Sequence, residues 1–115
     1  MREIGITTDF ERLDIDEYYE TVTGGLVTFC GYEGEADAVQ LNIDISTDYL
    51  DYEIYLMFHT DNTWYEQGPY EVDAETIRFT IPAEYMNPEY LVLVIEARLG
   101  SEVIKSPPVY LEVKR

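Results

Sequence analysis

The sequence predicts an all-β fold, an antiparallel β-sandwich, from three observations. Apolar and polar residues alternate over short segments, and this period of two indicates strands with one buried face. The segments follow one another about every 8–12 residues with turn residues between them, which is typical of an immunoglobulin-like sandwich of about seven or eight strands. Cys30 is the one cysteine, so the sandwich is expected to lack an internal disulfide.

The clearest strand is residues 90–99, which open with the longest apolar run of the chain. Its inner face alternates with the polar residues Glu96 and Arg98, so the outer face becomes wet halfway along. Gly100 supplies a turn, because glycine adopts positive φ readily. Pro107-Pro108 then precede the alternating residues 109–113. Because proline is tolerated at sheet edges and bulges, we expect this last strand to be a kinked edge strand.

Alternation predicts further strands before this segment, over residues 26–32, 39–45, 52–60, 63–67 and 77–81. Asp61-Asn62 is a turn signal, so residues 52–67 are expected to form a hairpin, which Gly68-Pro69 would break. Residues 82–88 have a helical composition, but two prolines limit them to about one turn. We expect this turn to connect the two sheets.

The first 20 residues differ from the rest of the chain. Ile4 and Ile6 allow a short strand, but residues 9–20 carry many acids and have no clean period. We therefore expect an N-terminal arm or edge segment over residues 1–20 and one sandwich domain over residues 21–115. A neighbouring subunit could order the arm, with Tyr18 and Tyr19 as its anchor.

Charge restricts the classes of partner. Seven basic residues against 24 acidic ones give a formal net charge of −17. Nucleic acid and anionic membranes would be repelled, whereas a basic protein surface would be attracted. The first residues lack the apolar region of a signal peptide, and no segment approaches the roughly 20 apolar residues that span a bilayer. We expect synthesis in the cytoplasm.

No catalytic, cofactor or metal site is expected from the motifs. His59 is the one histidine, and neither it nor Cys30 lies in a nucleophile signature. Cys30 stands in an apolar run and is expected to be a buried thiol. The carboxylates are dispersed and match no calcium-loop spacing.

Aromatic residues are the more informative feature, because eleven tyrosines exceed what a small core can use. Tyrosine and tryptophan are enriched at protein interfaces. Trp64 and its neighbours also suit packing within the hairpin or stacking on a sugar. The candidate interface residues are Tyr18, Tyr19, Trp64, Tyr65 and Tyr70.

Three segments carry a resemblance to a known family: IRFTIPAEYM at 77–86, YLVLVIEA at 90–97 and VIKSPPVYLEV at 103–113. With them, residues 39–113 resemble small immunoglobulin-like proteins encoded in the structural gene clusters of tailed bacteriophages. They are also broadly similar to the N-terminal domain of phage baseplate upper proteins.

The resemblance implies a virion protein without catalytic activity, located in the virion after synthesis in the host cytoplasm. Its expected partners are capsid, tail or baseplate proteins, or further copies of itself. Baseplate proteins continue into other domains, so we expect an accessory or decoration role. Two alternatives remain: an acidic inhibitor that mimics nucleic acid, and a carbohydrate-binding module that uses Trp64 and Tyr65.

Overall fold

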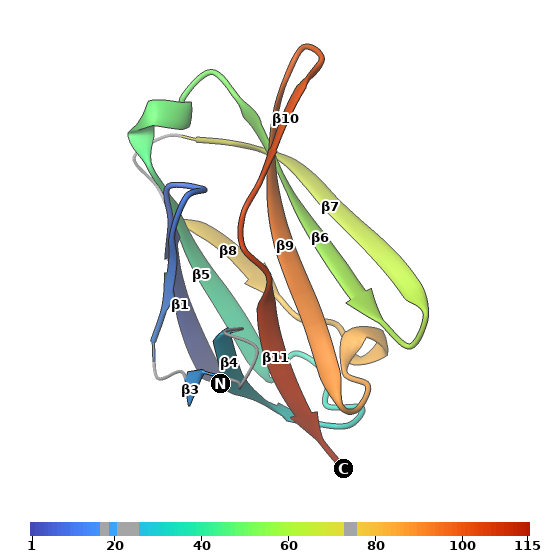
Figure 1. Ribbon diagram of the computed structural model, residues 1–115. Coiled ribbons are helices and arrows are strands. Elements are labelled where there is room, and N and C mark those ends of the chain that lie inside the picture. The colour runs from blue at the N-terminus through green and yellow to red at the C-terminus, as the bar shows by residue number, and fades with distance from the viewer. Residues whose placement is uncertain (17–18, 21–25, 73–75) are drawn as a thin grey trace.

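Two β-sheets make up the described part of the chain (Figure 1). The structure is a computed structural model that describes residues 1–16, 19–20, 26–72 and 76–115. The smaller sheet has four strands, in the order β2 (Leu13–Ile15), β1 (Arg2–Thr8), β5 (Val39–Ile45) and β8 (Ile77–Thr80). The larger sheet has seven strands, with the path β3 (Tyr19–Glu20), β4 (Leu26–Tyr32), β11 (Val109–Lys114), β9 (Tyr90–Leu99), β6 (Glu53–Thr60) and β7 (Thr63–Glu71), and with β10 (Glu102–Lys105) paired to β9.

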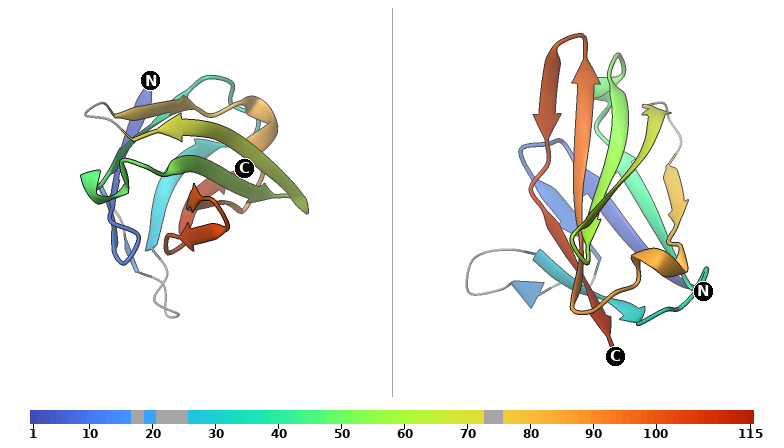
Figure 2. Two further views of the ribbon diagram at one scale, coloured as in Figure 1. Left: turned by 90° about the horizontal axis from the view of Figure 1, so that it is seen from above. Right: turned by 90° about the vertical axis from the view of Figure 1, so that its right-hand side faces the viewer.

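The two sheets face each other across one hydrophobic core (Figure 2). Alternate residues of β1, β5, β6 and β11 point into it, as the period of two predicts. The fully or almost fully buried residues include Ile4 and Ile6 of β1, Leu41 and Ile43 of β5, Leu56 and Phe58 of β6, and Leu91, Leu93 and Ile95 of β9. The predicted all-β sandwich without a disulfide is confirmed, but the pairs β1–β5 and β4–β11 are parallel, whereas the sequence predicted antiparallel pairing throughout. Cys30 is buried in this core as a free thiol, as expected.

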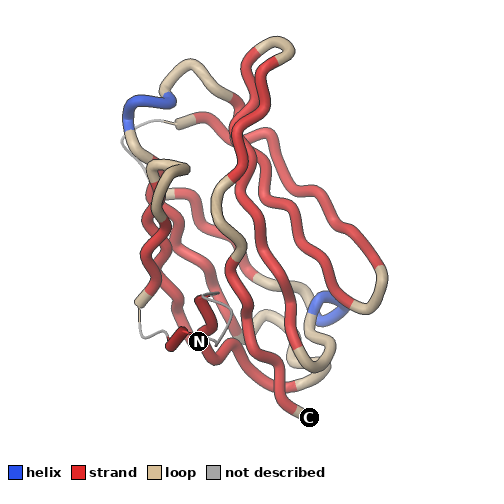
Figure 3. The backbone as a smooth tube through the Cα atoms, in the orientation of Figure 1, coloured by secondary structure: helices blue, strands red, loops and turns tan. Residues whose placement is uncertain are grey.

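The predicted hairpin is confirmed as β6 and β7, which are long neighbouring strands in Figure 3. Asp61 and Asn62 take φ values of 47° and 58° between the strands, a conformation that suits a tight hairpin turn. Gly68-Pro69 does not break the hairpin: β7 runs through it to Glu71, and the pairing register shifts nearby. Because β7 is an edge strand, the missing proline N–H costs no ladder bond.

The strand after the two prolines is not an edge strand, which corrects the sequence-based expectation. β11 lies between β9 and β4 and pairs with both. Pro107-Pro108 stand between β10 and β11, outside either ladder. Just before them, the Ser106 amide donates to the Ile95 carbonyl (2.8 Å) and the Ile95 amide donates to Ser106 Oγ (3.0 Å). The prolines therefore divide one long partner of β9 into two strands.

The first strand is also placed differently from the expected arm. β1 pairs parallel with β5 over its whole length and antiparallel with β2, so it lies inside the smaller sheet. Burial of Ile4 and Ile6 accounts for this placement, because each apolar side chain is stabilised by leaving water. The edge position is taken by β2. Tyr18 lies outside the described residues.

Short helical turns and aromatic residues complete the fold. The predicted single turn at 82–88 is confirmed as η2 (Ala83–Tyr85), and a second turn, η1 (Thr47–Tyr49), follows β5. Phe10 is buried between β1 and β2 and packs on Tyr49, with ring centroids 4.6 Å apart.

None of the helices among the described residues is long and apolar enough to cross a membrane.

Candidate functional site

One row of side chains crosses the outer face of the larger sheet, from β7 to β11. Trp64 pairs with His59, and His59 pairs with Val92. Val92 pairs in turn with Tyr110 of β11. Paired residues share a face of the sheet, and the next residue along β9, Leu93, is fully buried in the core. The row therefore points away from the core, and most of its side chains are apolar or aromatic.

Beside this row the outer face is hollowed. The depression has a volume of about 300 Å³ and is lined by Met57, Trp64, Val94, Glu96 and Lys105. These residues come from four adjacent strands, β6, β7, β9 and β10. We call this depression the Trp64 hollow. Met57 and Val94 form its apolar floor, and the Trp64 indole forms one wall. The Glu96 carboxylate and the Lys105 ammonium group lie on the side opposite Trp64.

The Trp64 side chain of the hollow is 62% exposed. Its indole lies against the imidazole of His59, with ring centroids 4.5 Å apart and an interplanar angle of 32°. This tilted ring contact covers part of the indole and leaves the rest accessible to a ligand.

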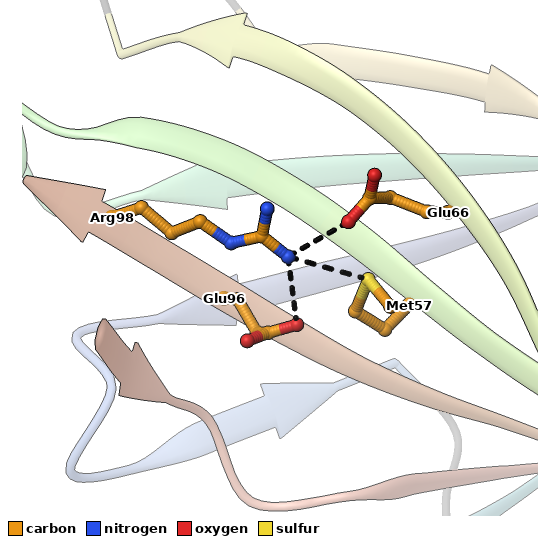
Figure 4. A network of polar contacts seen from close by, with 4 residues as sticks. All are labelled: Met57, Glu66, Glu96 and Arg98. Atoms are coloured by element: carbon orange, nitrogen blue, oxygen red, sulfur yellow. Dashed lines mark hydrogen bonds and ion pairs between the residues drawn. The ribbon is translucent and has the colours of Figure 1, made fainter. Parts of the chain in front are cut away.

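A charged network, drawn in Figure 4, shares Met57 and Glu96 with the lining of the hollow. Arg98 Nη2 donates to Glu66 Oε1 at 2.8 Å and to Glu96 Oε2 at 3.3 Å, and it lies 3.9 Å from Met57 Sδ. The same guanidinium lies over the ring of Tyr55, 3.8 Å from its centroid. The hydrogen bond to Glu66 is the main cause of the raised pKa of Arg98.

This network explains how a carboxylate can be buried on the outer face. Glu96 is only 8% exposed, and an isolated buried charge would be costly. Arg98 supplies the opposite charge and a hydrogen bond, which is the condition under which buried carboxylates are tolerated. The alternation in the sequence predicted that side chains on the outer face would be exposed to water from Glu96 onward. In the structure, the Glu96 side chain is instead buried and forms an ion pair with Arg98.

The candidate interface residues do not form one surface. Trp64 points outward, whereas Tyr65 and Tyr70 pair with the buried residues Phe58 and Ile54 and pack against the core. The ring of Tyr65 stacks on Tyr85, with centroids 4.2 Å apart. The structure describes Tyr19 as part of β3 but not its side chain, and Tyr18 lies outside the described residues.

Two other exposed residues of this outer face were not among the candidates. Tyr90 is 39% exposed and meets Tyr110 edge to face, with ring centroids 6.0 Å apart. Val103 of β10 is 49% exposed and pairs with Arg98. One signal could have found this face: the run 91–95 is apolar at every position, and a strand with a single buried face alternates instead.

The outer face of the smaller sheet is polar, in contrast. Gln40 donates to Asn42 Oδ1 at 2.7 Å, and Asn42 donates to Glu3 Oε1 at 3.2 Å. Asp44 accepts from the Thr76 hydroxyl at 2.7 Å. Within the described ranges, no group of three His, Cys, Asp or Glu side chains is placed to hold a metal ion. Among the described strands, the apolar outer face is therefore that of the larger sheet.

His59 and Cys30 are not brought together. His59 lies on the outer face against Trp64, whereas Cys30 lies in the core with its Sγ 3.9 Å from Met86 Sδ. Burial raises the pKa of the Cys30 thiol to about 12, so little thiolate forms near neutral pH. The geometry supports a packing role for this cysteine.

Comparisons with protein-family models, with curated proteins and with solved structures find no match for this chain. The geometry of the outer face and the sequence resemblance are therefore the two grounds for a function.

Proposed function

We propose that this chain is a non-enzymatic attachment module that binds another protein through the outer face of its larger sheet. The observation that carries the proposal is the outer-face row that begins at the exposed Trp64, with Tyr90 exposed on the same face and an apolar hollow beside the row. Large contiguous apolar patches on soluble proteins usually mark binding surfaces. Tryptophan, tyrosine and methionine are also enriched at the centres of protein interfaces.

Charge narrows the class of partner. The chain carries a net charge of −17, so its field attracts basic protein surfaces and repels further copies of itself. On the outer face of the larger sheet, however, Arg98 is paired with Glu66 and Glu96. The long-range field would therefore orient a basic partner, and the apolar row would provide the close contact.

The resemblance to immunoglobulin-like phage proteins suggests the assembly to which this module attaches. That assembly is a tailed-phage virion, and the partner is a capsid, tail or baseplate protein. The strand order supports the immunoglobulin-like part of this proposal. β11-β9-β6-β7 follows the G-F-C-C′ order of a variable-type sandwich, and β5-β8 follows the B-E pair. The parallel pairing of β1 with β5 departs from that pattern.

Particle purification tests the proposed function. Phage particles induced from the genome that encodes this chain would be banded on a density gradient and analysed by quantitative mass spectrometry. We expect the chain in the particle band at a fixed ratio to the major capsid protein. A chain found only in the soluble fraction, with capsid, tail and baseplate proteins in the band, would contradict the virion role.

A carbohydrate-binding module is the second candidate, because an exposed indole suits a sugar ring. The paired platform first expected for it does not form, since Tyr65 faces the core. A glycan array probed with the wild-type protein and Trp64→Ala separates the two functions. Binding to a defined glycan that Trp64→Ala abolishes would favour the sugar, and a silent array would favour the protein partner.

A further inference from the structure

We propose that the Trp64 hollow receives an arginine side chain of the partner protein. This inference rests on the proposed function, because it names the group by which a basic partner would be anchored. It commits to one occupant, a guanidinium on an aliphatic stem, chosen from the chemistry of the lining.

The lining matches the parts of an arginine side chain. Met57 and Val94 form the apolar floor, on which three methylene groups could lie. The exposed indole of Trp64 offers its face to a planar cation, and tryptophan is the best aromatic partner for this contact. The Glu96 carboxylate lines the hollow, and Glu66 pairs with Met57 across the neighbouring strands. Guanidinium groups bind carboxylates through planar, directed hydrogen bonds.

The chain itself shows this type of recognition next to the hollow. Arg98 lies 3.8 Å from the centroid of the Tyr55 ring, and its Nη2 contacts both Glu66 and Glu96. One aromatic face and two carboxylates therefore already hold a guanidinium on this sheet. The hollow offers a similar combination, the Trp64 indole in place of the phenol ring and the Glu96 carboxylate, which it shares with Arg98.

Arginine fits better than lysine for two reasons. A guanidinium stacks on aromatic faces and is more weakly hydrated than an ammonium group, so it loses less on entering an apolar depression. The strong negative charge of the chain favours either cation over an anionic group. Lys105 on the wall of the hollow works against a cation, and among the described residues it takes part in no ion pair.

Because Lys105 would repel a cationic ligand, the proposal can be tested by comparing probes of different charge and by removing the Lys105 charge. Trp64 is the one tryptophan of the chain, so its indole N–H signal in a ¹H–¹⁵N spectrum reports directly on the hollow. The probes are capped single residues: Nα-acetyl-arginine amide, the uncharged isostere Nα-acetyl-citrulline amide, and Nα-acetyl-glutamate amide. Each is titrated into the full chain at low ionic strength.

We expect the arginine probe to shift the Trp64 signal with an affinity about two- to fivefold above that of the citrulline probe, the ratio that a cation–aromatic contact provides at an exposed site. Lys105→Ala should strengthen arginine binding by about twofold at low salt, because it removes a like charge from the wall. Lys114→Ala is the matched control, since Lys114 lies over Phe29, away from the hollow, and it should change nothing.

Equal affinities for arginine and citrulline would overturn the inference, and so would stronger glutamate binding or weaker arginine binding in Lys105→Ala. The test is separate from that of the proposed function. A chain present in purified particles whose hollow ignores arginine would leave the attachment module intact and remove only the anchor. If the hollow binds arginine but the chain is absent from particles, the virion role is contradicted and the arginine-binding hollow is still supported.

Discussion

Trp64 and Tyr65 are neighbours in β7 and lie on opposite faces of the larger sheet. The Trp64 indole is exposed and touches His59, whereas the Tyr65 ring stacks on Tyr85 above the core. Two adjacent aromatic residues thus have separable roles. One is available for a partner, and the other stabilises the sandwich.

The first prediction follows from this separation. Tyr65→Ala should lower the free energy of unfolding by about 2–3 kcal/mol, because it removes a half-buried ring and its stacking partner. Trp64→Ala should change it by less than about 0.5 kcal/mol, as surface substitutions do. Urea denaturation of both variants measures the difference. Equal losses would mean that Trp64 is a packing residue.

A second prediction concerns β1. Ile6 is 1% exposed in the middle of the smaller sheet, so Ile6→Ala should cost about 2–4 kcal/mol of unfolding free energy. Thr7→Ala, on the exposed face of the same strand, is the control and should cost less than about 1 kcal/mol. Both are measured by urea denaturation. If Ile6→Ala were as mild as Thr7→Ala, the first strand would be the loose arm after all.

A third prediction concerns the thiol of Cys30. Burial raises its pKa from 9.0 to about 12, so a thiol reagent at pH 8 should react only when the protein unfolds. Because the folded-state pKa is the higher one, the stabilising effect of the protonated thiol is complete below about pH 9 and lost as the pH rises toward about 12.

Urea denaturation across this pH range measures the loss. Relative to Cys30→Ala, the unfolding free energy of the wild type should fall by up to about 1.4 kcal/mol for each pH unit above 9. The comparison isolates the contribution of the thiol, because the two proteins share every other titratable group. Parallel profiles, or rapid modification of the folded protein at pH 8, would show that the thiol is not buried.

The Arg98 network gives a fourth prediction. Arg98→Met leaves the Glu96 carboxylate buried without its cation, and it should cost about 2–3 kcal/mol. Glu66→Gln removes only the more exposed partner, and it should cost less than about 1 kcal/mol. The double variant Arg98→Met, Glu96→Leu should recover most of the loss, because no unpaired charge remains. A double variant as unstable as Arg98→Met would exclude this explanation.

Local patterns account for the parts of the fold that the sequence predicted well. Alternation located the strands 26–32, 39–45 and 90–99, and Asp61-Asn62 located the hairpin turn. These features depend on residues that are close in the chain. The burial of Cys30 followed in the same way, from the apolar run around it.

The features that were missed depend on contacts between distant segments. The parallel pairing of β1 with β5 joins residues more than thirty positions apart, and no period within β1 encodes it. Pro107-Pro108 indicated an edge strand, but they interrupt the chain before β11 begins, so β11 can pair on both sides. Burial of Glu96 depends on Arg98, and the alternation of polar and apolar residues carries no information on such pairing.

Co-sedimentation of surface variants with purified particles tests the central claim most directly. Trp64→Glu places a charge on the outer face of the larger sheet, and Leu50→Glu places one at an exposed apolar residue beside η1, where Leu50 is 56% exposed. Circular dichroism first establishes that both variants fold. The account predicts that the wild type and Leu50→Glu sediment with the particles, whereas Trp64→Glu stays in the supernatant. Sedimentation of Trp64→Glu at the wild-type level would contradict it.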